Sequence, residues 1–128
     1  AAQITGAIVG VILANLMFDL PAIEISEKIR AGNNIYLSEI IATFGLLLTI
    51  SIISIKNSSI IAPAVGLYIT AGYWFTSSTS FANPAVSIAR SFTNTFTGIC
   101  PSNVIYFIIM QTTAVIIVFF TAKVLLKD

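Results

Sequence analysis

The chain has 128 residues, of which 57% are apolar and only 9% charged, and its mean hydropathy is +0.99. Soluble domains carry about a quarter charged residues, so this composition excludes an ordinary soluble domain, and a net charge of +1 argues against a nucleic-acid partner. With no histidine and a single cysteine, we expect no metal site, no cofactor and no hydrolytic triad.

The charged residues gather at a few positions, and the stretches between them match the length of membrane spans. A helix that crosses the bilayer needs about 20 predominantly apolar residues. We therefore expect one small membrane domain over residues 1–128, entirely α-helical and embedded in the lipid bilayer. The predicted spans cover residues 1–20, 36–55, 60–76 and 104–126.

The first span begins at Ala1, already inside an apolar stretch. We therefore expect the chain to be a segment of something longer. The first two spans are joined by the one substantial polar connection, which we place outside the bilayer. Its charged side chains include Glu24, Glu27, Lys28 and Arg30.

Residues 77–100 differ from the spans because they begin with a polar run that is too weak to cross a membrane. Within them, Asn83 precedes Pro84, and an Asn cap before a proline at the first helical position is a strong helix start. We predict a re-entrant loop with a half-helix over 84–93. A helix that starts at mid-depth needs protein or a water-filled path around its free N–H groups. The segment therefore indicates a pore, and the alternative is a simple turn between two spans.

Three short motifs resemble one membrane family. They are Gln3-Ile-Thr-Gly-Ala7, Ser38-Glu39-Ile-Ile-Ala-Thr-Phe44 and Ala82-Asn83-Pro84-Ala85, and the last is the family's Asn-Pro-Ala (NPA) motif. Together they resemble the aquaporin and glycerol-facilitator (major intrinsic protein) family over practically the whole chain. Residues 68–99 look most like the bacterial branch found in arsenic-resistance operons. The resemblance implies the second inverted repeat of an aquaporin-like fold, with four spans, one re-entrant half-helix and an N-terminal repeat that is mostly missing.

The resemblance also implies which residues line the pore, beginning with Asn83, Pro84 and Ala85. Most members follow this motif with an arginine that charges the outer constriction, whereas Val86 stands here. The other two constriction positions fall on Ala71 and Ser80, so we expect a wide filter without its usual cation.

Arg90 lies one helical turn beyond Val86 on the same face. It either replaces part of the missing positive charge or is an ordinary arginine that reaches headgroups or loop carbonyls.

Glu39 is the one ionisable group inside the second predicted span, and membrane carboxylates are usually functional or paired. The resemblance implies that it accepts hydrogen bonds from the half-helix loop and holds the loop in shape; the alternative is a proton relay. Gln3 and Gln111 occupy equivalent points in the first and last spans, a short internal echo of the kind that inverted repeats show. We assign all three side chains to the loop scaffold.

The resemblance implies passive transport of water or small neutral solutes, such as glycerol, urea, arsenite or methylarsenicals, and no enzymatic activity. It further implies a homotetramer of multi-pass subunits in the inner membrane of a bacterium. The family needs two Asn-Pro pairs, and this chain contains one, at 83–84. The alternative is therefore a truncated or split-gene half that does not conduct alone, or that assembles with a separate N-terminal half.

Overall fold

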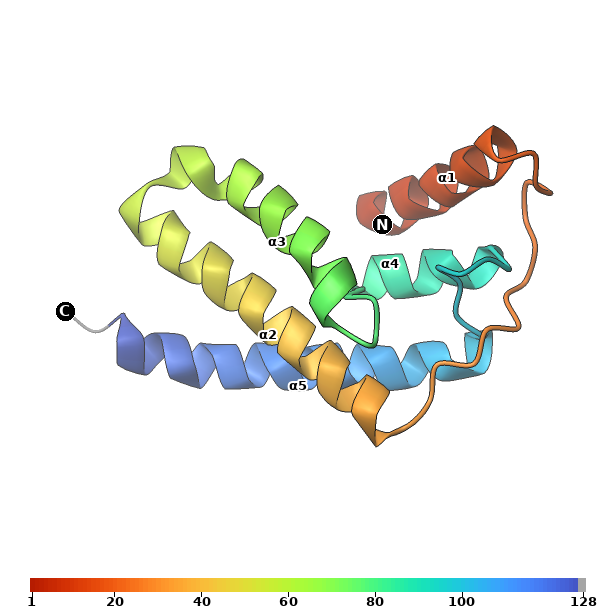
Figure 1. Cartoon of the computed structure of the whole chain (residues 1–128). Helices are drawn as coiled ribbons and strands as arrows, with labels where there is room; N and C mark the ends of the chain where they lie inside the picture. The colour runs from red at the N-terminus through yellow and green to blue at the C-terminus, as the bar shows by residue number, and fades with distance from the viewer. Residues whose placement is uncertain (127–128) are drawn as a thin grey trace.

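The computed structural model describes residues 1–126, and every regular element in that part of the chain is a helix (Figure 1). The last two residues of the predicted domain, 127 and 128, lie outside the described range. The elements are α1 (Ala2–Met17), α2 (Asn33–Lys56), the 3-10 turn η1 (Ser58–Ile60), α3 (Ile61–Phe75), α4 (Pro84–Ala89), the 3-10 turn η2 (Arg90–Phe92) and α5 (Pro101–Leu125).

Helices α2, α3 and α5 form one packed group (Figure 1). Helix α2 crosses α5, and α3 folds back along α2. Among the described residues, α2 and α5 are the two helices long and apolar enough to cross a membrane. Helix α5 begins three residues earlier than predicted because Pro101 occupies its first turn, where a missing N–H costs nothing. Large apolar side chains stay exposed on these helices, as expected for a surface that faces lipid.

Helix α1 ends at Met17, before the predicted end of its span, because the chain turns sharply at Asp19. The Asp19 backbone has a φ of 58°, a left-handed conformation that aspartate tolerates better than most residues. The N–H of Leu20 then donates to the Asn15 carbonyl at 2.9 Å, and that of Asp19 donates to Leu16 at 3.2 Å. This pair of bonds is a Schellman cap, which ends a helix and redirects the chain.

Helix α1 lies beside the short helix α4, apart from the α2–α3 pair (Figure 1). Helices α1 and α4 run in the same direction. The Asn15 side chain, near the end of α1, donates from its Nδ2 to the carbonyl of Phe92, in the η2 turn that follows α4, at 3.2 Å. Nothing comes within 4 Å of a Cβ placed on Gly6 or Gly10. The face of α1 that carries Gly6 and Gly10 is therefore not packed against another described segment at these two positions.

The buried core lies where the re-entrant segment meets α5. Phe81, Ile99 and Phe107 are its fully enclosed apolar side chains, and the rings of Phe81 and Phe107 are 5.1 Å apart between centroids. Two of these three residues belong to loops on either side of α4. The core therefore fixes the re-entrant segment rather than helices alone.

Candidate functional site

Helix α4 starts where local chemistry predicts it, at the Asn83–Pro84 pair. The Oδ1 of Asn83 accepts a hydrogen bond from the Ala85 N–H at 2.8 Å, and Pro84 occupies the first turn. Within residues 1–126, the Nδ2 of the same amide donates to no other group of the protein. The α-helix ends at Ala89 and continues as the η2 turn to Phe92, one residue short of the predicted half-helix.

The Asn83, Pro84 and Ala85 residues line a hollow of about 400 Å³ together with the first residues of α1. Gln3 is one of these lining residues and is exposed. The structure thus brings Gln3 beside the Asn-Pro-Ala motif from the side opposite to α5.

The incoming segment, residues 76–83, has a strained backbone. Thr79, Ser80 and Ala82 have φ values of 63°, 50° and 49°, which side chains other than glycine rarely adopt. Each such residue costs on the order of 1–3 kcal/mol, so the conformation persists only where its surroundings determine it.

Glu39 holds the end of the incoming segment through its N–H groups. The carboxylate is fully buried in α2 and accepts from the Ala82 N–H at 2.6 Å and from the Phe81 N–H at 3.3 Å. Gln111, in α5, donates its Nε2 to the same carboxylate at 2.8 Å and to the Ser87 hydroxyl at 2.9 Å. One amide thus links Glu39 to the middle of α4.

Arg30 holds the same region by donating hydrogen bonds to backbone carbonyl groups of that region. The sequence predicts Arg30 only as one charge of the polar connection outside the bilayer. In the structure it lies in the linker, residues 18–32, and its side chain is only 5% exposed. Its guanidinium donates from Nε to the Gly98 carbonyl at 2.7 Å, from Nη2 to Phe96 at 2.8 Å and from Nη1 to Ser78 at 3.3 Å. No periodicity or motif signals this role, because backbone carbonyls are present at every position.

Electrostatics around Arg30 follow from its burial and its neighbours. Desolvation lowers the pKa of the Arg30 guanidinium most, the positive charge of Arg90 lowers it further, and the Glu39 carboxylate raises it. The guanidinium carbons of Arg30 and Arg90 lie 5.1 Å and 4.5 Å from the centroid of the Phe81 ring. Phe81 therefore contacts both cations, at the distance of a cation–π interaction.

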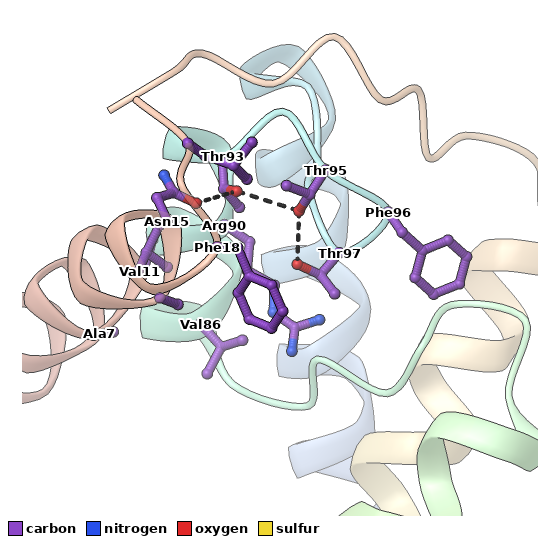
Figure 2. Close-up of a pocket in the computed structure, with 14 residues that line it drawn as sticks. Ala7, Val11, Asn15, Phe18, Val86, Arg90, Thr93, Thr95, Phe96 and Thr97 are labelled. Atoms are coloured by element: carbon purple, nitrogen blue, oxygen red, sulfur yellow. Dashed lines mark hydrogen bonds between the residues drawn. The ribbon is translucent and has the colours of Figure 1, made fainter. Parts of the chain in front are cut away.

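A cavity of about 720 Å³ opens between α1 and α4, and Val86 and Arg90 both face it (Figure 2). Side chains of a helix lean toward its N-terminus, so Arg90 reaches back over the turn that carries Val86. Its Nη2 donates to the Tyr73 hydroxyl at 2.7 Å. The guanidinium is therefore held between the end of α3 and the Phe81 ring.

One wall of this cavity carries a row of hydroxyl groups from the outgoing loop, residues 93–100 (Figure 2). The Thr93 hydroxyl donates to the Asn15 Oδ1 at 2.6 Å, and Thr93, Thr95 and Thr97 are linked in turn at 3.2 Å and 3.1 Å. Apart from Asn15, the facing wall is apolar and includes Ala7 and Val11 of α1 and Phe18 just beyond its end. The cavity therefore combines a polar stripe with an apolar side.

The two remaining predicted filter residues line neither hollow. Ala71 is exposed on α3, whereas Ser80 is buried, and its hydroxyl lies 2.6 Å from where a Cβ on Gly72 would be. The structure brings Val86 and Arg90 together at one cavity and Asn83–Ala85 with Gln3 at the other. Ser80 instead packs against Gly72 of α3.

Comparison with known proteins gives one informative relative. The chain is 54% identical over 110 residues to "Aquaglyceroporin AqpS" of Rhizobium meliloti (strain 1021), a match covering 86% of this chain and 47% of the relative. The chain thus spans about half the length of the curated relative it matches. No family model matches the chain, and no solved structure matches it.

Proposed function

We propose, because this chain belongs to the aquaporin and glycerol-facilitator family, that it builds half of the wall of a passive channel for water and small neutral solutes. The chain is a membrane protein of a channel family and not an enzyme. The observation that carries the proposal is α4, whose Asn83 amide keeps its Nδ2 free while its oxygen caps the helix. That arrangement offers a solute a donor beside the positive end of a helix dipole, which opposes cations.

The selectivity we propose is that of a wide filter. Val86 adds no charge at the cavity, and Arg90 supplies a guanidinium one turn further along, held by Tyr73. The threonine stripe and the apolar α1 wall suit solutes with hydroxyl groups on one side and C–H groups on the other, such as glycerol. Urea, arsenite and methylarsenicals belong to the same class of small neutral solutes. Ala71 and Ser80, which line neither hollow, stay outside the filter in this proposal.

The channel we propose is completed by a partner segment equivalent to the part of the Rhizobium relative that the chain does not match. Support comes from the open side of α4, where the α1 glycines have no neighbours and a large cavity remains. In this arrangement Gln3 donates a hydrogen bond to the partner segment, in the same way that Gln111 donates one to Glu39. We place the multi-pass subunits as homotetramers in the bacterial inner membrane. A second candidate is a channel half that does not conduct alone.

Stopped-flow light scattering on proteoliposomes tests both candidates. The samples are the 128-residue chain alone and the chain fused behind the unmatched part of the Rhizobium relative, challenged with sucrose, glycerol and arsenite gradients. We expect the fusion to raise water and glycerol permeability well above empty liposomes, and Asn83→Ala to remove most of the gain. Asn33→Ala, at an exposed asparagine in the first turn of α2, is the matched control and leaves permeability unchanged.

The outcomes separate the candidates. A fusion that inserts into liposomes at normal yield and matches empty liposomes contradicts the channel. A fusion that conducts while the chain alone does not supports the half-channel that needs a complement. Conduction by the chain alone contradicts that second candidate.

A further inference from the structure

We propose that Arg30 is a positioning residue of the filter, a buried clasp that fixes the incoming segment and the outgoing loop relative to each other. Its three carbonyl acceptors come from both sides of α4: Ser78 precedes the half-helix, whereas Phe96 and Gly98 follow it. Arg30 itself is anchored through its own N–H, which donates to the Asn103 Oδ1 at 3.0 Å. The side chain therefore ties the linker to both limbs of the re-entrant loop, and the backbone N–H of the same residue ties it to the start of α5. The inference rests on the proposed channel function.

Arg30 and Glu39 act on the incoming segment in complementary ways. The carboxylate satisfies the N–H groups at residues 81 and 82, and the guanidinium satisfies the carbonyl at residue 78. Three residues of strained backbone lie between and beside these anchor points. Since strained conformations persist only when their surroundings fix them, removing either anchor releases the segment that carries Ser80 and leads into Asn83.

The clasp also reaches the cavity. The carbonyls of Phe96 and Gly98 belong to the same loop as the Thr95 and Thr97 hydroxyls that line it. On its other side, Arg30 contacts Phe81, the ring against which the Arg90 guanidinium lies. Loss of Arg30 therefore shifts both the hydroxyl stripe and the cation of the filter.

An arginine is required because of its geometry. The planar guanidinium carries five N–H donors in a fixed fork, which reaches three carbonyls of different segments and still presents a flat face to Phe81. A lysine keeps the charge but is a point donor on a flexible stem. Arg30→Lys is therefore expected to behave more like the neutral Arg30→Met variant than like the native protein.

Two measurements on the native fusion and on Arg30→Met, Arg30→Lys and Lys56→Met test the clasp. Lys56 is exposed in the last turn of α2, so Lys56→Met removes one positive charge outside the clasp and serves as the matched control. We expect amide hydrogen exchange at residues 78–82 and 96–100 to rise at least tenfold in both Arg30 variants, with α2 and α5 unchanged. At equal inserted protein, we expect the glycerol-to-water permeability ratio to change at least threefold, because the cavity wall and Arg90 both shift. A purely structural loss would lower both permeabilities alike and leave the ratio unchanged.

Unchanged exchange at these segments together with an unchanged permeability ratio in Arg30→Met would overturn the clasp. Exchange that rises equally throughout α2 and α5 would also overturn it, since it marks a general loss of folding. If Arg30→Met fails to insert, Arg30→Lys decides by the same two readouts. A native fusion without conduction contradicts the channel itself, and hydrogen exchange on the folded protein then decides the clasp alone.

Discussion

The two sides of helix α4 differ sharply in how they are held. On the side of α2 and α5, the Glu39–Gln111 pair, the Arg30 clasp and the Phe81 core fill the space and satisfy the backbone. On the side of α1, a cavity of about 720 Å³ and a hollow of about 400 Å³ remain. Within the described residues, the re-entrant segment is therefore anchored from the side of α2 and α5, whereas both hollows lie on the side of α1.

The largest expected effect comes from removing the buried anchor of the packed side. Glu39→Leu leaves the N–H groups of Phe81 and Ala82 without an acceptor, and each buried orphan costs about 1–3 kcal/mol. We expect the free energy of unfolding to fall by roughly 2–6 kcal/mol, measured by thermal denaturation in detergent. Glu27→Leu, on the exposed linker, is the control. Equal melting curves for both variants would show that Glu39 holds nothing.

The same substitution on opposite sides of α4 sharpens the contrast further. A Cβ on Gly98 would collide with the Thr93 carbonyl and the Ser26 hydroxyl, so Gly98→Ala is expected to cost about 1–3 kcal/mol by overpacking. A Cβ on Gly10 meets nothing within 4 Å, so Gly10→Ala is expected to stabilise helix α1 by roughly 0.5–1 kcal/mol. Circular dichroism melts of the two variants measure the difference. Destabilisation by Gly10→Ala would mean that the α1 side is as tightly packed as the other.

On the open side, an added charge is expected to change selectivity rather than stability. Val86→Arg places a guanidinium in the cavity beside Arg90, and we expect the glycerol-to-water permeability ratio to fall about tenfold, equivalent to about 1.4 kcal/mol. Val86→Leu enlarges the side chain without charge and serves to separate size from electrostatics. An unchanged ratio in Val86→Arg would place the constriction elsewhere.

The smallest expected effect concerns the contact that orients Arg90. Tyr73→Phe removes the hydroxyl that accepts from the Arg90 Nη2 at 2.7 Å and keeps the ring. Tyr73 is 43% exposed, so the net loss lies at the lower end of the roughly 0.5–1.5 kcal/mol of a typical hydrogen bond. We expect about a twofold shift in the permeability ratio, and none from Tyr106→Phe. A shift as large as that of Val86→Arg would make Tyr73 itself a filter residue.

Local chemistry explains what the sequence predicts well. The start of α4 depends on two adjacent residues, Asn83 and Pro84, whose capping preferences act without tertiary help. The apolar stretches likewise predict the helices, with ends that shift by a few residues where Asp19 adopts a left-handed turn or Pro101 starts a helix early.

The rest of the site depends on contacts between distant segments. Arg30 reads as one of several linker charges, because its partners are carbonyls 48 to 68 residues away, and carbonyls have no sequence signature. The separation of Ser80 from the cavities arises in the same way, from the path of the strained incoming segment. A sequence pattern indicates which side chains are polar or charged. It does not indicate which backbone groups Arg30 and Glu39 bind in this site.

The spacing of the clasp has a consequence for biosynthesis. Arg30 leaves the ribosome 68 residues before Gly98, so at roughly 5–20 residues per second its guanidinium waits about 3–14 seconds for its last carbonyl. During that interval the three carbonyl acceptors of Arg30 are not all present, so the clasp cannot close. Closure of the clasp therefore follows the synthesis of the whole half-helix and of most of the outgoing loop.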